Sequence, residues 1–491
     1  MKHQLYILPL MLFAVASAFA QDFDRQTLSD IDILGTARYV SVAGAMTAVG
    51  GDVSAAADNP AALGIFRRGE LSFSASYKYD AVTSGGNFAN ARRVHIPQIS
   101  WVINFQHPER QKGLLSSSLM LQYHQRKQFI RNAAYSGVQS VSLTDLMADL
   151  THGLEESRLQ ASDWDINKVG ALSKTAYELY LIDPDTENKT YWHSVLNEGE
   201  KADASLSVNE RGSTNDYTVG WGANISNKVW LGISANLTSI SYSRTSVYTE
   251  KPEDGGSFAV TSSLAGNGFG FHANVGIVAQ PADFLRLGFS LHTPTWMTMK
   301  FASSTSSTGN MSTPAGYQYS PASATDDHYT MPMRTTCGMA FLFSTKGMLS
   351  FEYDWNHQPK YGVADLHQLK LGAEVVVNNN LFLRAGYAFA SRFPKGDVLF
   401  SPSYDDLRTD TDFKNQYNLH YASAGVGFRN RFMLVELAYQ CRIENSRYYA
   451  FARPLYSSVD SEPYDWQSVS FDHRGLTHLL VFSIGWTPRR R

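Results

Sequence analysis

Cysteine is nearly absent from this 491-residue sequence, in which Cys337 and Cys441 are the only two. Both fall on the apolar phase of segments far apart in the chain, so we expect free thiols rather than a disulfide. The 14 histidines include no HExxH spacing, and no cysteine pair marks a metal site. We therefore expect no metal, no cofactor and no enzyme.

Charged residues are also few, at 18% of the chain, and the formal net charge is only −3. A nucleic-acid-binding surface normally requires a strong basic excess, so the sequence predicts no nucleic-acid partner. Aromatic residues, in contrast, make up 13%, with 26 tyrosines and 27 phenylalanines. This content needs an explanation that a polar surface does not supply.

Long apolar runs are missing beyond the first twenty residues. Residues 1–20 combine Lys2, an apolar stretch from Leu5 to Val15 and the small-x-small tripeptide Ala18-Phe19-Ala20. This pattern predicts a secretory signal peptide cleaved near Ala20. No later run approaches the roughly 18 to 20 apolar residues of a transmembrane helix. The exported chain is therefore expected to be either soluble or a β-barrel.

Strict alternation of apolar with small or polar residues recurs from residue 69 onward. Tyr217, Val219 and Trp221, for example, alternate with Thr218 and Gly220. Such period-two segments predict strands with one apolar face. We identify fourteen of them, at 69–78, 97–105, 115–125, 216–226, 228–242, 268–279, 283–292, 334–344, 347–356, 367–377, 380–390, 418–429, 431–443 and 476–486.

The connections between these segments alternate between short and long. Short ones include residues 226–227 and 378–380, whereas the long ones span 79–96, 126–215, 243–267, 293–333, 357–366, 391–417 and 444–475. Transmembrane barrels have short periplasmic turns, long outer loops and an even strand count. The mean hydropathy of −0.25 agrees, because only the outer face of a barrel must be apolar. We therefore predict an all-β, 14-stranded antiparallel transmembrane barrel with both ends of the chain on the short-turn side.

Aromatic residues gather near the ends of the predicted strands, where the interfacial girdles of a barrel lie. We expect outward positions there for Tyr77, Trp101, Trp230, Trp355, Tyr387 and Trp486. The last segment, residues 478–486, resembles the closing strand of outer-membrane barrels, although five residues, 487–491, follow it as a tail.

The longest connection, 126–215, has helical periodicity in place of alternation. Leu143, Leu146, Met147, Leu150 and Leu154 recur at helical spacing, which predicts an amphipathic helix outside the membrane. Two interpretations stay open. The apolar face packs within the loop, or Leu146, Met147 and Leu150 offer a landing surface that captures a ligand.

The segment before the first strand is rich in small residues. It contains Gly50 and Gly51 and a stiff turn at Asn59-Pro60-Ala61, because proline disfavours helical geometry in the residue before it. Small side chains suit a compact hatch that closes the lumen, and we predict this role for residues 21–68. The alternative is an ordinary turn that leads into the first strand.

This segment, Gly35–Gly64, resembles the N-terminal signature of the FadL/TodX family of outer-membrane transporters. The matching positions are Asp52, Ser54-Ala55, Asn59-Pro60-Ala61 and Leu63. The resemblance implies a 14-stranded barrel with an N-terminal hatch, passive uptake of long-chain fatty acids or other hydrophobic molecules, and lateral exit through a break in the wall. Relatives with the same signature serve secretion machinery, so a PorV-like docking barrel is the alternative function.

Inward-facing charges are expected on the predicted strands in equal numbers of each sign, at Arg286, Glu352, Asp354, Lys370, Glu374, Arg384, Glu436 and Arg442. One interpretation is a lumen made rigid by ion pairs. The other is that Arg286, Lys370 or Arg384 meets the carboxylate of an amphipathic ligand.

The sequence thus predicts a signal peptide (1–20), a hatch (21–68), a barrel (69–486) that contains the partly helical loop 126–215, and a tail (487–491). The hatch residues expected to matter are Gly50, Gly51, Asp52, Asn59, Pro60 and Ala61. We expect a monomer in the cell outer membrane whose partners are membrane lipid and a hydrophobic ligand such as a fatty acid.

Overall fold

The structure is a computed structural model of the whole chain. It describes residues 27–84, 86–160, 169–197, 199–253, 255–311, 317–319, 322–344, 346–357, 365–393, 409, 411–451, 468 and 470–488. The predicted signal peptide, its cleavage near Ala20 and the last three residues of the tail lie outside these ranges.

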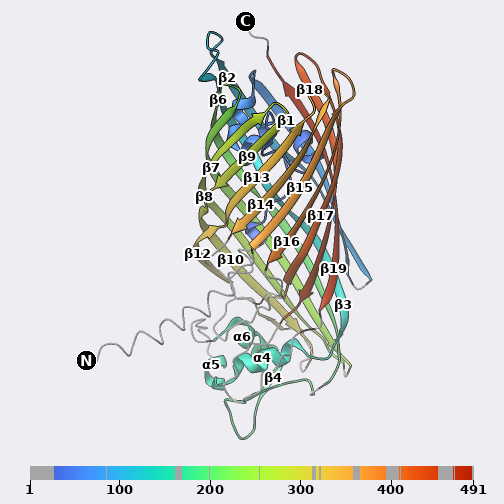
Figure 1. The fold of residues 1–491 in the computed structure, drawn as a ribbon. Helices are drawn as coiled ribbons and strands as arrows, with labels where there is room; N and C mark the ends of the chain where they lie inside the picture. The colour runs from blue at the N-terminus through green and yellow to red at the C-terminus, as the bar shows by residue number, and fades with distance from the viewer. Residues whose placement is uncertain are drawn as a thin grey trace, which may run out of the picture.

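A single closed antiparallel sheet forms the wall of the barrel (Figure 1). It closes because β1 pairs with both β2 and β19. β10 continues β9 beyond Pro294, and β13 continues β12 beyond Pro332, so each of these pairs counts as one strand of the wall. The three-residue β11 pairs only with the end of β10 and is not counted separately. The wall therefore has the fourteen predicted strands. The strands are β1 Glu70–Ser84, β2 Asn87–Gln106, β3 Leu114–Gln139, β6 Ala202–Ile225, β7 Val229–Pro252, β8 Phe258–Ala282, β9 Leu285–His292, β10 Thr295–Gly309, β11 Tyr317–Tyr319, β12 Ala322–Met331, β13 Met333–Leu342, β14 Gly347–His357, β15 Asp365–Val376, β16 Leu381–Phe393, β17 Phe413–Arg429, β18 Met433–Tyr449 and β19 Phe471–Trp486.

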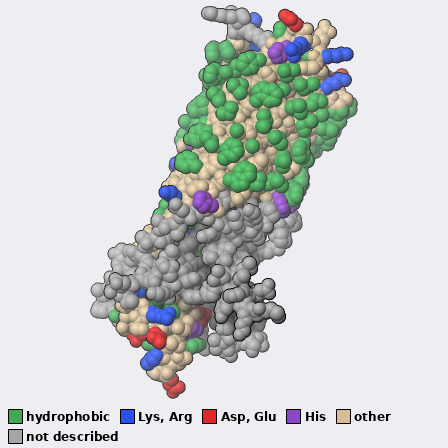
Figure 2. Space-filling view, turned by 90° about the vertical axis from the view of Figure 1, so that its left-hand side faces the viewer, with side chains coloured by type: hydrophobic (Ala, Val, Ile, Leu, Met, Phe, Trp, Pro, Cys, Tyr) green, Lys and Arg blue, Asp and Glu red, His purple; other side chains and the backbone are tan. Residues whose placement is uncertain are grey.

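The period-two pattern sets which side chains face out. Tyr217, Val219 and Trp221 are exposed on the outer face, whereas Thr218, between Tyr217 and Val219, is buried. Exposed apolar side chains cover the outer surface as a broad belt (Figure 2). A belt of this kind fits lipid rather than water. The predicted outward position is wrong for one girdle residue, because Trp230 points inward and is buried against Ala61 and Val278.

Three of the expected long loops are largely strand, and one of them, residues 293–333, lies mostly in β10, β11 and β12. Residues 79–96 belong to β1 and β2, which meet at a tight turn after Ser84, and residues 243–267 belong mostly to β7 and β8. The 126–215 connection is likewise shorter than expected, because β3 runs to Gln139 and β6 starts at Ala202. The strands therefore extend well beyond the apolar belt on the long-loop side.

A small helical cap covers the long-loop end of the barrel. It contains α4 Leu143–Thr151, α5 Glu156–Gln160, α6 Ala171–Glu178 and the hairpin of β4 Ile182–Pro184 with β5 Trp192–Ser194. Ser142 and Asp145 form a capping box that starts α4. The cap packs on the extended strands through Tyr135, Tyr248 and Phe471, among others. It lies at the end opposite the C-terminus (Figure 1).

The N-terminal hatch fills the lumen near the short-turn end. It contains α2 Ala37–Ser41, α3 Val53–Asp58 and the 3-10 helix η1 Pro60–Ile65. Its small side chains pack on inward Met120, Ala340 and Val481 of the wall. The hatch thus supplies the core that a barrel of this width needs inside.

The two cysteines are free thiols, as predicted, and Cys337 is exposed on the outer face. No helix within the described ranges is long and apolar enough to cross a membrane.

Candidate functional site: the hatch and the gap in the wall

The Asn59-Pro60 turn anchors the hatch. The fully buried Asn59 side chain accepts a hydrogen bond from the Ala61 N–H (3.1 Å) and donates one to the Thr47 carbonyl (2.9 Å). Pro60 then starts η1, where its missing N–H costs nothing. One amide side chain therefore ties two parts of the hatch together.

Glycines in the wall make room for the hatch backbone. A Cβ on Gly232 would lie 2.1 Å from the Pro60 carbonyl carbon, and one on Gly276 would lie 1.8 Å from Asn59 Oδ1. Similar close approaches recur at Gly222, Gly288, Gly386 and Gly425, and a Cβ on Gly338 would lie 3.2 Å from the Ala48 nitrogen. The hatch thus packs on the inward strand positions that carry glycine in place of a larger side chain.

Asp52 caps α3 and joins it to α2. Its carboxylate accepts hydrogen bonds from the Ser54 N–H (2.8 Å) and the Thr36 hydroxyl (2.8 Å). Gly50 and Gly51 precede it with φ of +64° and +67°, the left-handed region that favours glycine. These residues form the turn that reverses the chain between the two helices.

A buried ionic cluster binds the hatch to the wall. Asp58 accepts hydrogen bonds from the Tyr39 hydroxyl and from Arg334 of β13 (2.8 Å). Burial alone would raise the pKa of Asp58, but Arg334 and Lys370 lower it by more, so the carboxylate stays ionised. Burial, and then the Asp58 charge, raises the pKa of the Tyr39 phenol well above its usual range.

The same cluster continues along the wall. Arg334 also pairs with Asp354 (2.8 Å), which pairs with Lys370 (2.6 Å). Lys370 in turn pairs with Glu352 (2.8 Å), whose other oxygen accepts the Thr47 N–H (2.8 Å). The chain of contacts therefore begins and ends on the hatch.

A second ionic cluster lies nearer the short-turn end. Arg38 of α2 pairs with Glu374 of β15 (3.0 Å) and donates to the Gly51 carbonyl (3.1 Å). Arg384 pairs with Glu374 (2.6 Å) and with Glu436 (2.9 Å). The hatch is thus held at two heights in the barrel by ion pairs with charged side chains of the wall.

The wall itself is interrupted between β2 and β3. Their pairing begins at Gln106↔Ser116 and stops at Gln98↔His124. Beyond that level residues 87–95 pair with β1, and residues 125 and 127–139 pair with β6. Pro97 lacks an N–H for the ladder, and β3 carries a bulge between Gln125 and Lys127.

We call this interruption the wall gap. Side chains bridge its far end, where Asn132 donates to the Asn90 carbonyl (2.8 Å) and Asn87 to the Ser136 hydroxyl (2.8 Å). The gap is therefore bounded by paired strands on one side and by these two bridges on the other.

Residues Thr27–Leu34, here called the gate segment, back the wall gap from inside. The Asp32 N–H donates to the Arg126 carbonyl (2.9 Å), and His124 Nε2 donates to the Leu34 carbonyl (3.1 Å). The Asp32 carboxylate pairs with Lys78 of β1 (3.2 Å). His124 is the last residue of β3 that pairs with β2, and Arg126 lies just beyond it, so the gate segment contacts the unpaired edge at Arg126.

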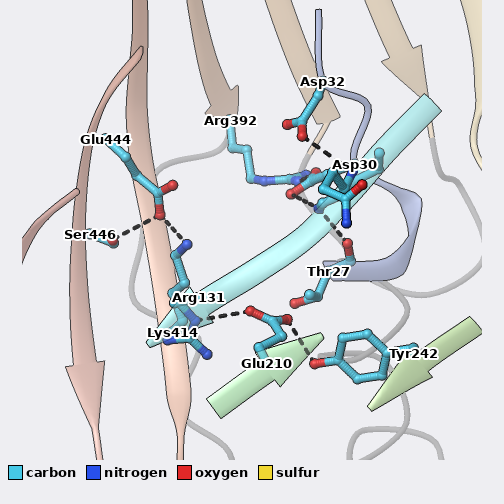
Figure 3. A network of polar contacts seen from close by, with 12 residues as sticks. Thr27, Asp30, Asp32, Arg131, Glu210, Tyr242, Arg392, Lys414, Glu444 and Ser446 are labelled. Carbon is cyan, nitrogen blue, oxygen red and sulfur yellow. Dashed lines mark hydrogen bonds and ion pairs between the residues drawn. The ribbon is translucent and has the colours of Figure 1, made fainter. Parts of the chain in front are cut away.

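Above the hatch, a network of polar contacts crosses the lumen (Figure 3). Figure 3 shows Thr27, Asp30 and Asp32 of the gate segment beside Arg392, with Arg131 and Glu210 opposite. The cavity there measures about 80 Å³ and is lined by six acidic and six basic side chains. Drug-sized ligands occupy roughly 300–1,000 Å³ of mostly apolar space. A cavity this small and this charged is unsuited to an apolar ligand.

The three cations expected to meet a ligand carboxylate differ in their surroundings. Lys370 and Arg384 are paired with wall carboxylates, as described above. Arg286 instead donates to the Val49 carbonyl (3.0 Å) and lies over the Trp230 ring. It also lines a cavity of about 580 Å³ at the short-turn mouth.

The residues expected to capture a ligand, Leu146, Met147 and Leu150, are all buried in the core of the cap. A ligand that reaches them must enter that core.

Sequence reasoning missed Arg334, Asp58, Tyr39 and the gate segment. Arg334 shares the inward phase of Thr336 and Gly338, so alternation could have found it. The partners of Asp32 and Asp58 are set by the path of the hatch through the lumen, which no local pattern indicates. No group of three or more metal-ligating side chains occurs in the described part of the chain.

A closed 14-stranded barrel with an N-terminal hatch and an interrupted wall has the architecture of outer-membrane channels. No family model matches the sequence, and no curated protein matches it either.

Solved structures, however, share the fold. The toluene transporter TodX of P. putida aligns with a TM-score of 0.54 at 13% identity, covering 94% of this chain and 100% of that one. A FadL homologue of Pseudomonas aeruginosa aligns with 0.57 at 12% identity, covering 94% and 99%. The monoaromatic hydrocarbon channel CymD gives 0.52 at 11%, with the same coverage. The chain therefore has the FadL/TodX fold.

Proposed function

We propose that this protein is a passive conduit for hydrophobic small molecules in the outer membrane. Ligand enters from the cap side and leaves sideways through the wall gap between β2 and β3 when the gate segment withdraws. The single observation that carries this proposal is the contact of the gate segment with the unpaired edge of β3, at Asp32 and Arg126. The chain acts as an exported monomer and without catalysis.

Lateral exit suits an apolar ligand. The charged network in the lumen and the buried ion pairs below it oppose passage of an apolar molecule along the barrel axis. A gap in the wall opens instead into the hydrocarbon of the membrane, where such a molecule gains its transfer free energy.

The ligand class follows from the comparisons together with the gap. TodX is a toluene transporter, and CymD is a monoaromatic hydrocarbon channel. We propose a long-chain fatty acid or an aromatic hydrocarbon for this chain. Arg286 is the candidate for a ligand carboxylate, because Lys370 and Arg384 already neutralise wall carboxylates. Leu146, Met147 and Leu150 give the cap an apolar interior for first capture.

The hatch residues have distinct roles in this proposal. Gly50 and Gly51 supply the turn, Asp52 holds α3 to Thr36, and Asn59-Pro60-Ala61 locks the hatch against the wall glycines. Movement of the hatch therefore requires these contacts to break together.

A disulfide between hatch and wall tests the proposal. An ideal Cβ on Gly338 lies 3.5 Å from the Ala48 Cβ, which is within disulfide range. The pair Ala48→Cys and Gly338→Cys is made with Cys337→Ser and Cys441→Ser, and fatty-acid uptake is measured in proteoliposomes. We expect uptake when the pair is reduced and its loss when oxidised.

The cysteine-free Cys337→Ser, Cys441→Ser protein is the matched control and should transport under both conditions. Equal uptake by the oxidised and reduced pair would overturn the role of the hatch. Protein that carries no fatty acid or toluene in any form, but retains exported proteins on its cap, would instead support the docking function.

A further inference from the structure

An outward hydroxyl side chain paired with an outward histidine recurs in four consecutive hairpins on the cap side of the barrel. In each, a hydroxyl on the strand that rises toward the cap contacts a histidine Nδ1 on the strand that returns. The pairs are Thr298 with His328 (3.1 Å), Tyr353 with His367 (2.7 Å), Tyr387 with His420 (2.8 Å) and Tyr439 with His478 (2.6 Å). We call these eight residues the hydroxyl–histidine belt.

The three tyrosine pairs share one register. Tyr353 lies opposite Leu369, Tyr387 opposite Ala422 and Tyr439 opposite Leu480. In each case the histidine is two residues closer to the cap. The Tyr353–His367 and Tyr439–His478 rings are nearly parallel, with interplanar angles of 26° in both. Repetition of one geometry on separate hairpins indicates a common role.

The next hairpin, β1 with β2, replaces the histidine by an arginine. The Arg92 guanidinium lies 5.7 Å from the centre of the Tyr79 ring, and Tyr79 also stacks on His478. The belt of nitrogen donors therefore continues around the barrel with a permanent positive charge.

The belt lies at the cap-side edge of the apolar surface. On β19 the outward residues run from Trp486 through Phe482 and Leu480 to His478. The eight residue steps from Trp486 to His478 span about 26 Å at roughly 3.3 Å per step. This length is close to the height of a barrel's apolar surface before strand tilt is allowed for. Figure 2 shows histidine side chains along the edge of the apolar surface that is nearer the cap. Lipid headgroups begin at this level.

The hydroxyl contact prepares each imidazole as a donor. When a hydroxyl donates its O–H to Nδ1, the neutral ring carries its proton on Nε2 and can donate a further hydrogen bond from that nitrogen. Donors in a row at the headgroup level match the oxygens of a phosphate.

An apolar groove lies beside two of the pairs. It measures about 520 Å³ on the outer face, and Tyr353, Leu369, Tyr387 and Phe389 are part of its lining. Phe351 and Leu371 continue it toward the middle of the membrane. The groove fits an acyl chain whose headgroup meets His367 and His420.

We propose that the hydroxyl–histidine belt is a binding site for a phosphorylated lipid of the cap-side leaflet. The acyl chain lies in the groove, and the phosphate accepts hydrogen bonds from the histidines and Arg92. This site is independent of transport, because it faces away from the lumen. It fixes the height of the barrel in the membrane on the side where the cap begins.

The test measures lipid binding to the full-length protein in detergent micelles. The probes are a glycolipid with two phosphates and the same lipid after dephosphorylation, and native mass spectrometry counts the bound molecules. We expect the wild-type protein to bind the phosphorylated form about tenfold more tightly, since hydrogen bonds to a charged group are stronger than those to a neutral one. The variant His367→Leu, His420→Leu, His478→Leu should lose this preference.

The matched control replaces outward residues of the same strands nearer the short turns, as Val375→Leu, Phe428→Leu, Phe482→Leu. It should keep the wild-type preference. Equal binding of both lipids by the wild-type protein, or an unchanged preference in the histidine variant, would overturn the proposal. Displacement of the lipid by millimolar inorganic phosphate would show an ion site and would also overturn it.

Discussion

The backbone N–H of Asp32 donates to the carbonyl of Arg126, 2.9 Å away, where β3 has left its pairing with β2. A residue of the hatch thereby occupies a hydrogen-bonding position on the edge of an interrupted wall. In the proposed function this hydrogen bond links closure of the lumen to closure of the wall, so that one movement of the gate segment releases both.

Removal of the Asp32 charge should loosen the gate segment. Asp32 pairs with Lys78 (3.2 Å) and with Arg442 (3.1 Å). Asp32→Asn removes this carboxylate from both cations, and Arg442 keeps only Glu444 (3.4 Å) as an ion-pair partner among the described contacts. We expect destabilisation of about 3 kcal/mol, typical of a broken buried pair, and a higher passive permeability of proteoliposomes to hydrophobic dyes.

Glu210→Gln is the matched control. Glu210 pairs with Arg131 (3.0 Å) in the same lumen, and none of its described contacts is with the gate segment. Its loss should lower stability without raising permeability. Equal permeability of the two variants would contradict a specific role for Asp32.

Acid should release the gate segment for the same reason. Burial would raise the pKa of Asp32, but Lys78 and Arg442 lower it by more, so the folded-state pKa lies below the usual value. A depressed carboxyl pKa contributes stability above about pH 4, and this stability is lost as the pH falls further. Permeability measured from pH 6 to pH 3 should therefore stay flat at first and rise only below about pH 4. A rise already complete at pH 5 would argue against these carboxylates.

Asn59→Ala should weaken the hatch by roughly 2 kcal/mol, since it removes a cap and leaves the buried Thr47 carbonyl without its donor. Asn59→Asp keeps the acceptor for Ala61 but loses the donor, so it separates the two effects. Urea unfolding followed by tryptophan fluorescence measures both. Wild-type stability and uptake in Asn59→Ala would remove the proposed role of this turn.

Gly232→Ala should displace the hatch, because the added Cβ would lie 2.1 Å from the Pro60 carbonyl carbon. Overpacking of this kind lowers the free energy of unfolding by about 1–3 kcal/mol. The obstructing atoms here are backbone atoms of Pro60 and Ala61. Gly309→Ala is the control, since its nearest neighbour would lie at an ordinary 3.6 Å. Proteolysis of the hatch should increase only in the first variant, and equal protection in both would contradict the close packing.

Leu146→Ala should open the cap rather than the barrel. Leu146 is almost fully buried in the cap core, and such truncations cost about 2–5 kcal/mol. Limited proteolysis should cut between residues 143 and 197 while the barrel remains intact. If uptake falls as well, the cap takes part in capture; a cap that resists cleavage as the wild type does would contradict the packing.

The barrel could be predicted from the sequence because lipid enforces period-two alternation. The fourteen segments, the inward phase of Glu352 and Lys370, and the hatch at Asn59-Pro60 all follow from local patterns. The strand extensions beyond the membrane were missed, because both faces of residues such as Arg244–Glu250 are polar or packed under the cap and need not alternate in hydrophobicity.

The contacts of the hatch could not be predicted. Asp58 with Arg334 and Asp32 with Lys78 join residues far apart in the sequence, and their pairing depends on the path of the hatch through the lumen. The inward Trp230 was missed for a similar reason, since its place is set by Ala61 of the hatch and not by its own strand. The wall gap depends on two strands ceasing to pair, and Pro97 alone does not indicate where β3 departs.

The most direct measurement is photolabelling of the protein in proteoliposomes with a diazirine fatty acid, followed by mapping of the labelled peptides. Exit through the wall gap predicts label on residues 87–97 and 125–131, and its loss when the Ala48→Cys, Gly338→Cys pair is oxidised. Label confined to the short-turn mouth, around Arg67 and Arg429, would contradict lateral exit.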